Sequence, residues 1–353
     1  MKAFSKTLLL LAGMSLLLAG CQKEGRYSSG DGVIRFAAAT SPQTKTAYGD
    51  FGGYDANNNP SWQRIDWKAG DWIRIASDVA VHRYNGNNWS DYRVVGTPTA
   101  DGRQSKAEID NPENGNGLVW DDSQTDYVFW AMYPAAGTTE TNLTAGKLSM
   151  TIPSAQDVTK EADYQYLFAR TVVDRLPASK YEKYVTLYFN PAFTAFEIHL
   201  KSLDDPIKLV DFTLESESSS LAGTLVAPIS GVDENATLGT ATVSSGTKKV
   251  SITFPTGDDA IIITKDGEET VFTLFALPQT YNDLTLKFNV EINDVAETRS
   301  FPLKNAGSWI SFAPFKKHRL TGLRMPGSTW KIFFGDLTVD EWENGGSSSL
   351  IVE

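Results

Sequence analysis

The sequence predicts an all-β protein built of β-sandwich domains, and three observations carry this prediction. Apolar and polar residues alternate with period two in several segments, as they do in strands that bury one face and expose the other. Turn signals separate these segments, and long helical patterns are scarce. Short strands at regular spacing with few helices are typical of β-sandwiches.

The first residues of the chain look like an export signal. Lys2 and Lys6 precede an apolar run, residues 8–18, which has the length of a signal-peptide core and is too short to span a bilayer. The small residues before Cys21, the single cysteine of the chain, match the bacterial lipobox. We therefore expect removal of residues 1–20 as a lipoprotein signal peptide and attachment of a membrane lipid anchor to Cys21.

The next segment, residues 21–31, is polar and rich in Gly and Ser, which predicts a flexible tether. Its start, Gln22-Lys23-Glu24-Gly25, resembles the export signal that sends Bacteroidetes lipoproteins to the outer face of the outer membrane. A plain polar tether is the alternative. With one cysteine, a disulfide within the chain is impossible.

A short strand is expected after the tether, over residues 32–40. Its apolar positions include Val33, Ile34, Phe36 and Ala38, and its alanines allow close but replaceable packing against a sheet. Residues 41–50 form a polar, proline-containing loop, and loops of this kind are common sites of proteolysis.

The strand pattern is clearest in the second half of the chain. Alternation of apolar and polar residues predicts strands around four segments: 196–200, 210–214, 250–254 and 284–292. Turn signals stand at Asn85-Gly86, Asp101-Gly102, Asp266-Gly267, Pro255 and Pro278. One short helix is expected within residues 158–170.

The length of 353 residues exceeds one typical core and predicts two domains. A polar stretch near residues 178–184 separates two apolar regions, so we place an N-terminal β-sandwich at 32–180 and a C-terminal one at 181–353.

The C-terminal tail, residues 330–353, has the pattern of two short strands. Its strand-forming residues are Ile332, Phe334, Leu337 and Val339. The apolar phase changes at Gly335, a residue type that permits a bulge or bend. The tail therefore either reaches into a neighbouring molecule or closes its own domain.

Neither the charge nor the motifs indicate catalysis. The net charge of −11 argues against nucleic acid as a partner. No metal-binding HExxH, nucleophile elbow or phosphate-binding glycine loop occurs, so we expect no enzyme, no cofactor and no metal site. His199 falls on the polar face of a predicted strand, where we expect it to be solvated.

Tryptophans are frequent in the first half of the chain and suggest a further hypothesis, since aromatic platforms on β-sandwiches stack on sugar rings. They are Trp62, Trp67, Trp72, Trp89 and Trp120. Core packing or stapling of hairpins is the alternative role for these side chains.

Six segments in their order and spacing resemble the fimbrillin family of Bacteroidales, the subunits of type V pili. They are Val33–Phe36, Lys45–Tyr48, Arg64–Ile75 with its W-x-x-G-D-x-I core, Ala131–Pro134, Thr151–Gln156 and Leu187–Phe196. The resemblance runs from residue 21 nearly to the C-terminus.

This resemblance implies two tandem transthyretin-like β-sandwich domains and assembly by donor-strand exchange. In that family, a surface protease cuts behind the N-terminal strand, and a C-terminal strand of a neighbouring subunit replaces it. The matching cut lies between Lys45 and Thr46, where the best-known members carry Arg; Arg35, inside the strand, is a weaker candidate. The implied partners are other pilin subunits, in a homo- or hetero-polymer, together with the surface protease and the outer-membrane lipid anchor.

The same resemblance implies a location on the cell surface and, after processing, in the fimbrium. Two alternatives stay open at this stage. The N-terminal strand is permanent if the protein is a basal anchor subunit. A surface lipoprotein that binds glycan or protein and never polymerises is the alternative function.

Overall fold

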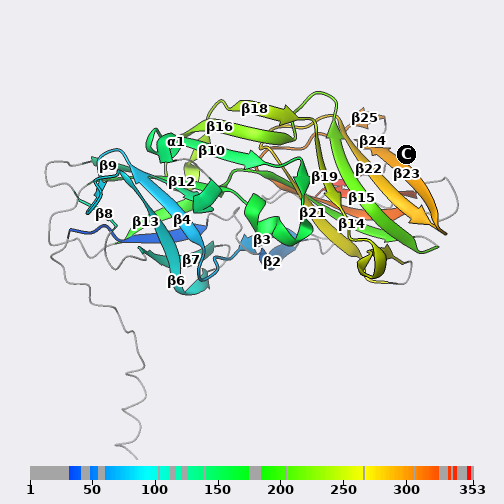
Figure 1. Cartoon of the computed structure of the whole chain (residues 1–353), viewed down its shortest axis with the longest axis horizontal. Helices are drawn as coiled ribbons and strands as arrows, with labels where there is room; N and C mark the ends of the chain where they lie inside the picture. The colour runs from blue at the N-terminus through cyan, green and yellow to red at the C-terminus, as the bar shows by residue number, and fades with distance from the viewer. Residues whose placement is uncertain are drawn as a thin grey trace, which may run out of the picture. The chain divides into compact units, whose positions relative to one another are not determined.

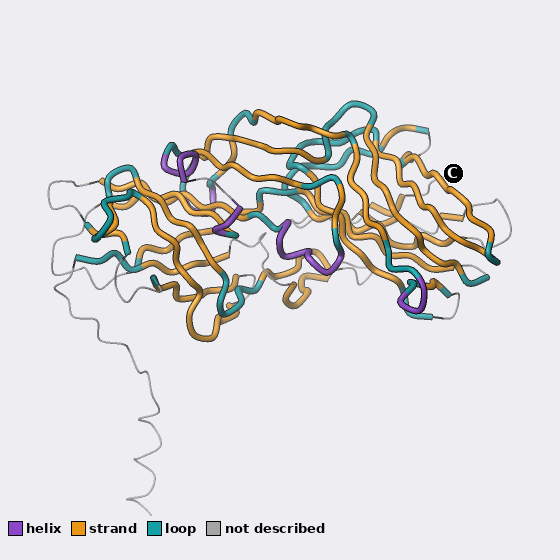
Figure 2. The backbone as a smooth tube through the Cα atoms, in the orientation of Figure 1, coloured by secondary structure: helices purple, strands orange, loops and turns teal. Residues whose placement is uncertain are grey.

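A computed structural model describes residues 32–40, 48–54, 60–101, 104–111, 117–120, 126–137, 140–174, 184–202, 205–264, 267–305, 307–325, 333–334, 337–339 and 348–350. Strands predominate over short helices (Figure 2), which confirms the all-β prediction. No helix within the described ranges is long and apolar enough to cross a membrane.

The N-terminal half forms a sheet that closes on itself. Its strands, in spatial order, are β1 (Phe36–Thr40), β13 (Val185–Pro191), β12 (Leu167–Asp174), β9 (Asp126–Tyr133), β4 (Trp72–Ser77), β6 (Trp89–Asp101) and β7 (Gln104–Asp110), and β7 pairs again with β1. Figure 1 shows β1 in dark blue near β13 and β7. The interior is filled by apolar side chains at alternate strand positions, such as Ile73 and Ile75 of β4.

Two larger sheets make up most of the C-terminal half. One contains β11 (Ala155–Gln156), β19 (Lys249–Thr253), β15 (Ile207–Ser216), β22 (Leu284–Ile292) and β23 (Val295–Pro302), with β20 (Ile262–Ile263) paired to β15. The other contains β21 (Thr270–Ala276), β14 (Thr194–Ser202), β26 (Lys317–Met325) and β27 (Phe333–Phe334). Phe212 of β15 meets Phe272 of β21 edge to face, with ring centroids 5.0 Å apart, so these two sheets share a core.

A third sheet joins the halves of the chain through β10 (Lys147–Ile152), which pairs antiparallel with β16 (Ala222–Ser230). β17 (Thr237–Leu238) and β18 (Thr242–Thr247) pair with the other side of β16. Next along the chain, the buried Gln156 amide bonds both backbone groups of Phe275, at 2.6 and 2.9 Å. Residues 147–156 are thus integrated into the sheets of the C-terminal half.

The remaining elements are short. The small strand pairs are β2 (Tyr48–Tyr54) with β3 (Pro60–Ile65), β5 (Val81–His82) with β8 (Leu118–Val119), β24 (Lys304–Asn305) with β25 (Ser308–Trp309), and β28 (Leu337–Val339) with β29 (Ser348–Leu350). The helices are η1 (Ala135–Gly137), α1 (Glu140–Thr144), η2 (Val158–Tyr164), η4 (Asp233–Asn235) and η5 (Gly257–Asp259).

The expected helix within 158–170 is only partly present. The 3-10 helix η2 covers Val158–Tyr164, and strand β12 begins at Leu167. β12 is fixed by its ladder with β9 from Leu167 to Asp174, and this tertiary pairing overrides the local helical tendency.

The expected domain boundary at 180/181 lies outside the described residues. Strand β13, on the C-terminal side of that boundary, contributes to the closed sheet, and the chain enters the C-terminal sheets at β14. Contacts within the chain join the residues from Val33 onward into one compact unit. The division into two transthyretin-like domains therefore stays a prediction.

Candidate functional site: the slot of strand β1

Strand β1 lies between two strands that are distant from it in the sequence. It pairs parallel with β13, from Phe36↔Val185 to Thr40↔Phe189, and antiparallel with β7, from Phe36↔Ile109 to Ala39↔Lys106. β7 and β13 do not pair with each other in the closed sheet. Within the described part of the chain, the space between them, defined here as the β1 slot, is therefore filled by the N-terminal segment.

The side chains of this segment belong to the core. Ile34 is 1% exposed, and Phe36 and Ala38 are fully buried. The Phe36 ring meets Tyr92 and Phe129 edge to face, with centroids 5.2 and 5.1 Å away. Alternate residues thus point inward, and Phe36 is the bulky anchor of the strand.

The upstream end of the segment is held by backbone bonds to residues 118–119. The Ile34 N–H donates to the Leu118 carbonyl at 2.8 Å, and Val33 forms an antiparallel bridge with Val119. The Leu118 N–H in turn donates to the Tyr92 hydroxyl at 2.8 Å. Burial raises the pKa of Tyr92 above its usual range, so this hydroxyl stays neutral.

The downstream end is fixed by a buried polar relay. The backbone N–H of Ser105 donates to the Thr40 hydroxyl at 2.8 Å, and the Ser105 hydroxyl accepts from the backbone N–H of Trp67 at 3.1 Å. Thr40 is fully buried and Ser105 is 1% exposed, so these bonds satisfy polar groups that water does not reach.

The cleavage and lipidation residues predicted from the sequence fall outside the described residues. Lys45 and Thr46 come between the end of β1 at Thr40 and the start of β2 at Tyr48. Cys21 precedes the first described residue.

The tail residues predicted to form a donor strand are described in part. Phe334 lies in β27, where it pairs with Leu323 of β26. Leu337 and Val339 lie in β28 and pair with Leu350 and Ser348 of β29. Ile332 lies outside the described residues, as does Gly335, where the phase change is expected.

The expectation that His199 is solvated is wrong: this side chain is 7% exposed. Its two ring nitrogens lie 2.8 Å from carboxylate oxygens of Glu197 and Glu269. Glu197 also pairs with the buried Lys317 and, at 2.9 Å, with Arg319. The parallel pairing of β14 with β26 brings these charges together. Alternation of apolar and polar residues predicts a strand, but it does not predict which strand pairs with it.

Opposing effects act on the carboxyl of Glu197. Burial by itself raises its pKa, but the hydrogen bond with His199 and the cations of Lys317 and Arg319 outweigh burial and lower the pKa well below the usual range. The side chain is therefore an anion inside the sheet. No group of His, Cys, Asp and Glu side chains within the described part of the chain is arranged to hold a metal ion.

The tryptophans divide between core and surface. Trp67 is 3% exposed and packs edge to face on Phe189 and Tyr133. Trp120 packs on the buried Tyr127, and Trp89 lies under the guanidinium of Arg74. Trp72 is 42% exposed, which separates it from the core tryptophan Trp67.

These features define an all-β protein whose closed sheet is completed by its own N-terminal strand. A fimbrillin-like family model matches residues 57–321. The chain belongs to the fimbrillin-like family, as the sequence motifs had suggested. Comparison with curated proteins finds no match.

Comparison with solved structures finds similar proteins of low sequence identity. A "putative cell adhesion protein" from Bacteroides uniformis ATCC 8492 is 17% identical, with a TM-score of 0.51 over 89% of this chain and 99% of that one. Another protein of the same description, from Bacteroides ovatus ATCC 8483, is 16% identical, with a TM-score of 0.46 over 91% and 98%. A fimbrial assembly protein from Parabacteroides distasonis ATCC 8503 is 11% identical, with a TM-score of 0.42 over 90% and 98%.

Proposed function

We propose that this protein is a pilus subunit or adhesin of the cell surface that assembles by exchange of strand β1. It is made as a precursor, anchored in the outer membrane through a lipid on Cys21 and cut by a surface protease between Lys45 and Thr46. The observation that carries the proposal is the position of β1: an N-terminal segment fills the β1 slot between β7 and β13.

Because β1 lies between two strands, its withdrawal exposes both strand edges and part of the core. Withdrawal of β1 leaves the facing sides of β7 and β13 without backbone partners and opens the space around Tyr92 and Phe129. Unpaired strand edges bind extended peptides readily, because the peptide supplies backbone hydrogen bonds and its alternate side chains fill pockets. An emptied slot therefore selects another strand of similar pattern.

The C-terminal tail offers such a pattern. Ile332-Phe333-Phe334 repeats the spacing of Ile34-Arg35-Phe36, an isoleucine and a phenylalanine two positions apart. In an extended strand, residues at this spacing point to the same side. We place Ile332 and Phe334 of a neighbouring subunit at the positions of Ile34 and Phe36, with Leu337 and Val339 continuing beyond the bend.

The proposed partner is another pilin, either a second copy of this chain or a related subunit. The tail pairs within its own chain through Phe334 and Leu323, and this contact has to be released before exchange. The non-polymerising alternative, a surface protein that binds a glycan, is favoured by one observation, the exposed Trp72.

Limited trypsin digestion of the full-length lipoprotein tests the proposal. We expect a new N-terminus at Thr46, identified by mass spectrometry, followed by a ladder of oligomers on non-boiled gels. Lys45→Gln is the matched control and should give neither the new N-terminus nor the ladder. A variant with both Ile332→Asp and Phe334→Asp should be cut normally but stay monomeric. Cleavage at Lys45 that leaves the wild-type protein monomeric would overturn the proposal.

A further inference from the structure

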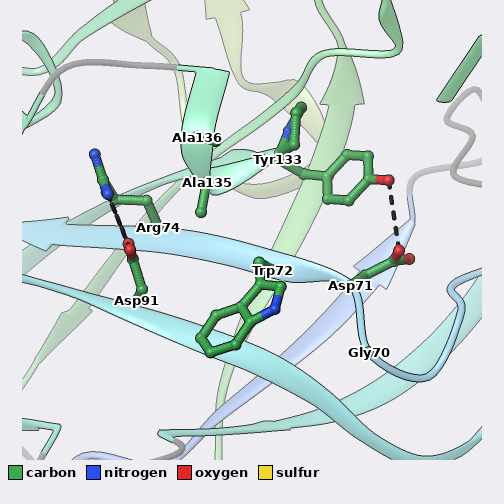
Figure 3. A pocket seen from close by; sticks show the side chains of 9 residues that line it. Gly70, Asp71, Trp72, Arg74, Asp91, Tyr133, Ala135 and Ala136 are labelled. Atoms are coloured by element: carbon green, nitrogen blue, oxygen red, sulfur yellow. Dashed lines mark hydrogen bonds and ion pairs between the residues drawn. The ribbon is translucent and has the colours of Figure 1, made fainter. Parts of the chain in front are cut away.

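A pocket of about 400 Å³ lies beside the start of strand β4 (Figure 3), and none of its lining residues is a strand partner of β1. Strands β4 and β6, the end of β9 and helix η1 contribute to it. Its lining residues are Gly70, Asp71, Trp72, Arg74, Asp91, Tyr133, Pro134, Ala135 and Ala136.

Trp72 supplies a flat apolar surface at this pocket. It is the first residue of β4 and is 42% exposed, whereas the next residue, Ile73, is fully buried. Strand alternation places Trp72 and Arg74 on the outer side and Ile73 and Ile75 in the core. An indole kept partly in water at the rim of a pocket offers apolar area for stacking at low entropic cost, since it has two side-chain torsions.

Arg74 is a rigid donor group in the same pocket. Its Nε and Nη2 donate to the two carboxylate oxygens of Asp91 at 2.7 and 2.9 Å, and its Nη1 donates to Glu140 at 2.7 Å. The guanidinium carbon also lies 4.7 Å from the ring centroid of Trp89. These contacts hold the planar group in one orientation.

Asp71 and Tyr133 form the opposite polar wall, as Figure 3 shows. The Tyr133 hydroxyl donates to one oxygen of Asp71 at 3.4 Å, and the Lys68 N–H donates to the other at 2.9 Å. The pocket thus combines one apolar face with carboxylates, a guanidinium and a hydroxyl whose positions are fixed by other protein groups.

We propose that this pocket binds a neutral pyranose ring of a carbohydrate. A sugar ring has an apolar C–H face that suits the Trp72 indole and a rim of hydroxyls that suits fixed donors and acceptors. Asp91 and Glu140 pair with the Arg74 guanidinium, and Asp71 lies on the opposite wall. These three carboxylates outnumber the guanidinium groups of Arg74 and of Arg93, which lies beside Gly70, so the local charge disfavours acidic sugars such as sialic or uronic acids. This inference does not depend on strand exchange, because the pocket lies outside the β1 slot.

Binding of the full-length protein to arrayed oligosaccharides tests the inference. The probes are neutral oligosaccharides of hexose and N-acetylhexosamine, each with its sialylated counterpart. We expect the protein to bind neutral probes and to lose this binding with their sialylated forms. Trp72→Ala should lower the affinity for the neutral probe that binds best by about tenfold or more, as measured by calorimetric titration.

Tyr84→Ala is the matched control, because Tyr84 is an aromatic residue that is 69% exposed and lies outside the pocket. Its affinity should equal that of the wild type. The inference is overturned if no neutral probe binds at millimolar concentration, or if Trp72→Ala binds as tightly as the wild type. Failure of this test leaves strand exchange unaffected, since ladder formation is measured separately.

Discussion

Phe36 of β1 lies edge-on to Phe129 of β9, with ring centroids 5.1 Å apart and ring planes at 80°. In the order of the closed sheet, β13 and β12 lie between β1 and β9, so this contact crosses the interior of the sheet. The N-terminal segment is therefore part of the core of this chain, although it precedes the proposed cleavage point.

Phe36→Ala tests how much β1 contributes to stability. Phe36 is fully buried, and loss of a buried phenylalanine side chain costs about 3–5 kcal/mol of unfolding free energy. Urea denaturation of the uncut protein measures this change. Val95→Ala, at an exposed apolar position, is the control and should stay within about 0.5 kcal/mol of wild type. Equal stability of Phe36→Ala and wild type would show that β1 is not an integral strand.

Thr40→Val tests the polar relay at the downstream end of β1. The valine keeps the shape of the threonine but leaves the buried Ser105 N–H without its 2.8 Å acceptor. An unsatisfied buried donor costs about 1–3 kcal/mol, which denaturant titration resolves. We also expect faster hydrogen exchange at the amide of Ser105. Unchanged exchange there would argue against the relay.

Glu197→Gln tests the buried charge cluster of β14 and β26. The substitution leaves the Lys317 and Arg319 cations beside a neutral amide, and breaking a buried ion pair costs about 3–5 kcal/mol. Glu291→Gln is the control, because its pair with Lys208 is about one-third exposed on both sides and is worth at most about 1 kcal/mol. Similar losses in the two variants would contradict the structural role of the cluster.

His318 predicts a pH dependence of stability. Burial lowers its pKa to about 4, from an ordinary value of 6.5, so the unfolded chain binds a proton in this interval while the folded chain does not. Stability should therefore fall as the pH is lowered from 6.5 towards 4, by about 3 kcal/mol at most. Denaturation midpoints measured between pH 7 and 5 report on His318 without a contribution from Glu197, because the Glu197 carboxyl is protonated only at lower pH. His318→Gln should flatten this slope, and an equal slope in both proteins would refute the assignment.

Local patterns in the sequence identify many strands but not their neighbours. Alternation of apolar residues predicted the strand around 284–292, and β22 spans Leu284–Ile292 with every second residue buried. The turn at Asn85-Gly86 is also present, with Gly86 at φ +72°. These features depend on local conformation and on burial of one face, which the sequence encodes directly.

The arrangement of the slot could not be read in the same way. The sequence predicts a strand containing Phe36, but its parallel pairing with Val185 and antiparallel pairing with Ile109 depend on contacts across long stretches of chain. The buried cluster around Glu197 was missed because β26 joins β14 from more than a hundred residues away. The pocket at Trp72 likewise needs η1 and β9 to approach β4.

The central claim, exchange of β1, is tested most directly by locking this strand in place. Ala38 and Ala107 are antiparallel partners, and cysteines at such paired positions lie within the range that a disulfide bridges. We predict that full-length protein carrying Ala38→Cys and Ala107→Cys is cut after Lys45 but forms no ladder when oxidised, and forms ladders after reduction. Ladder formation that is equally strong in the oxidised protein would contradict strand exchange.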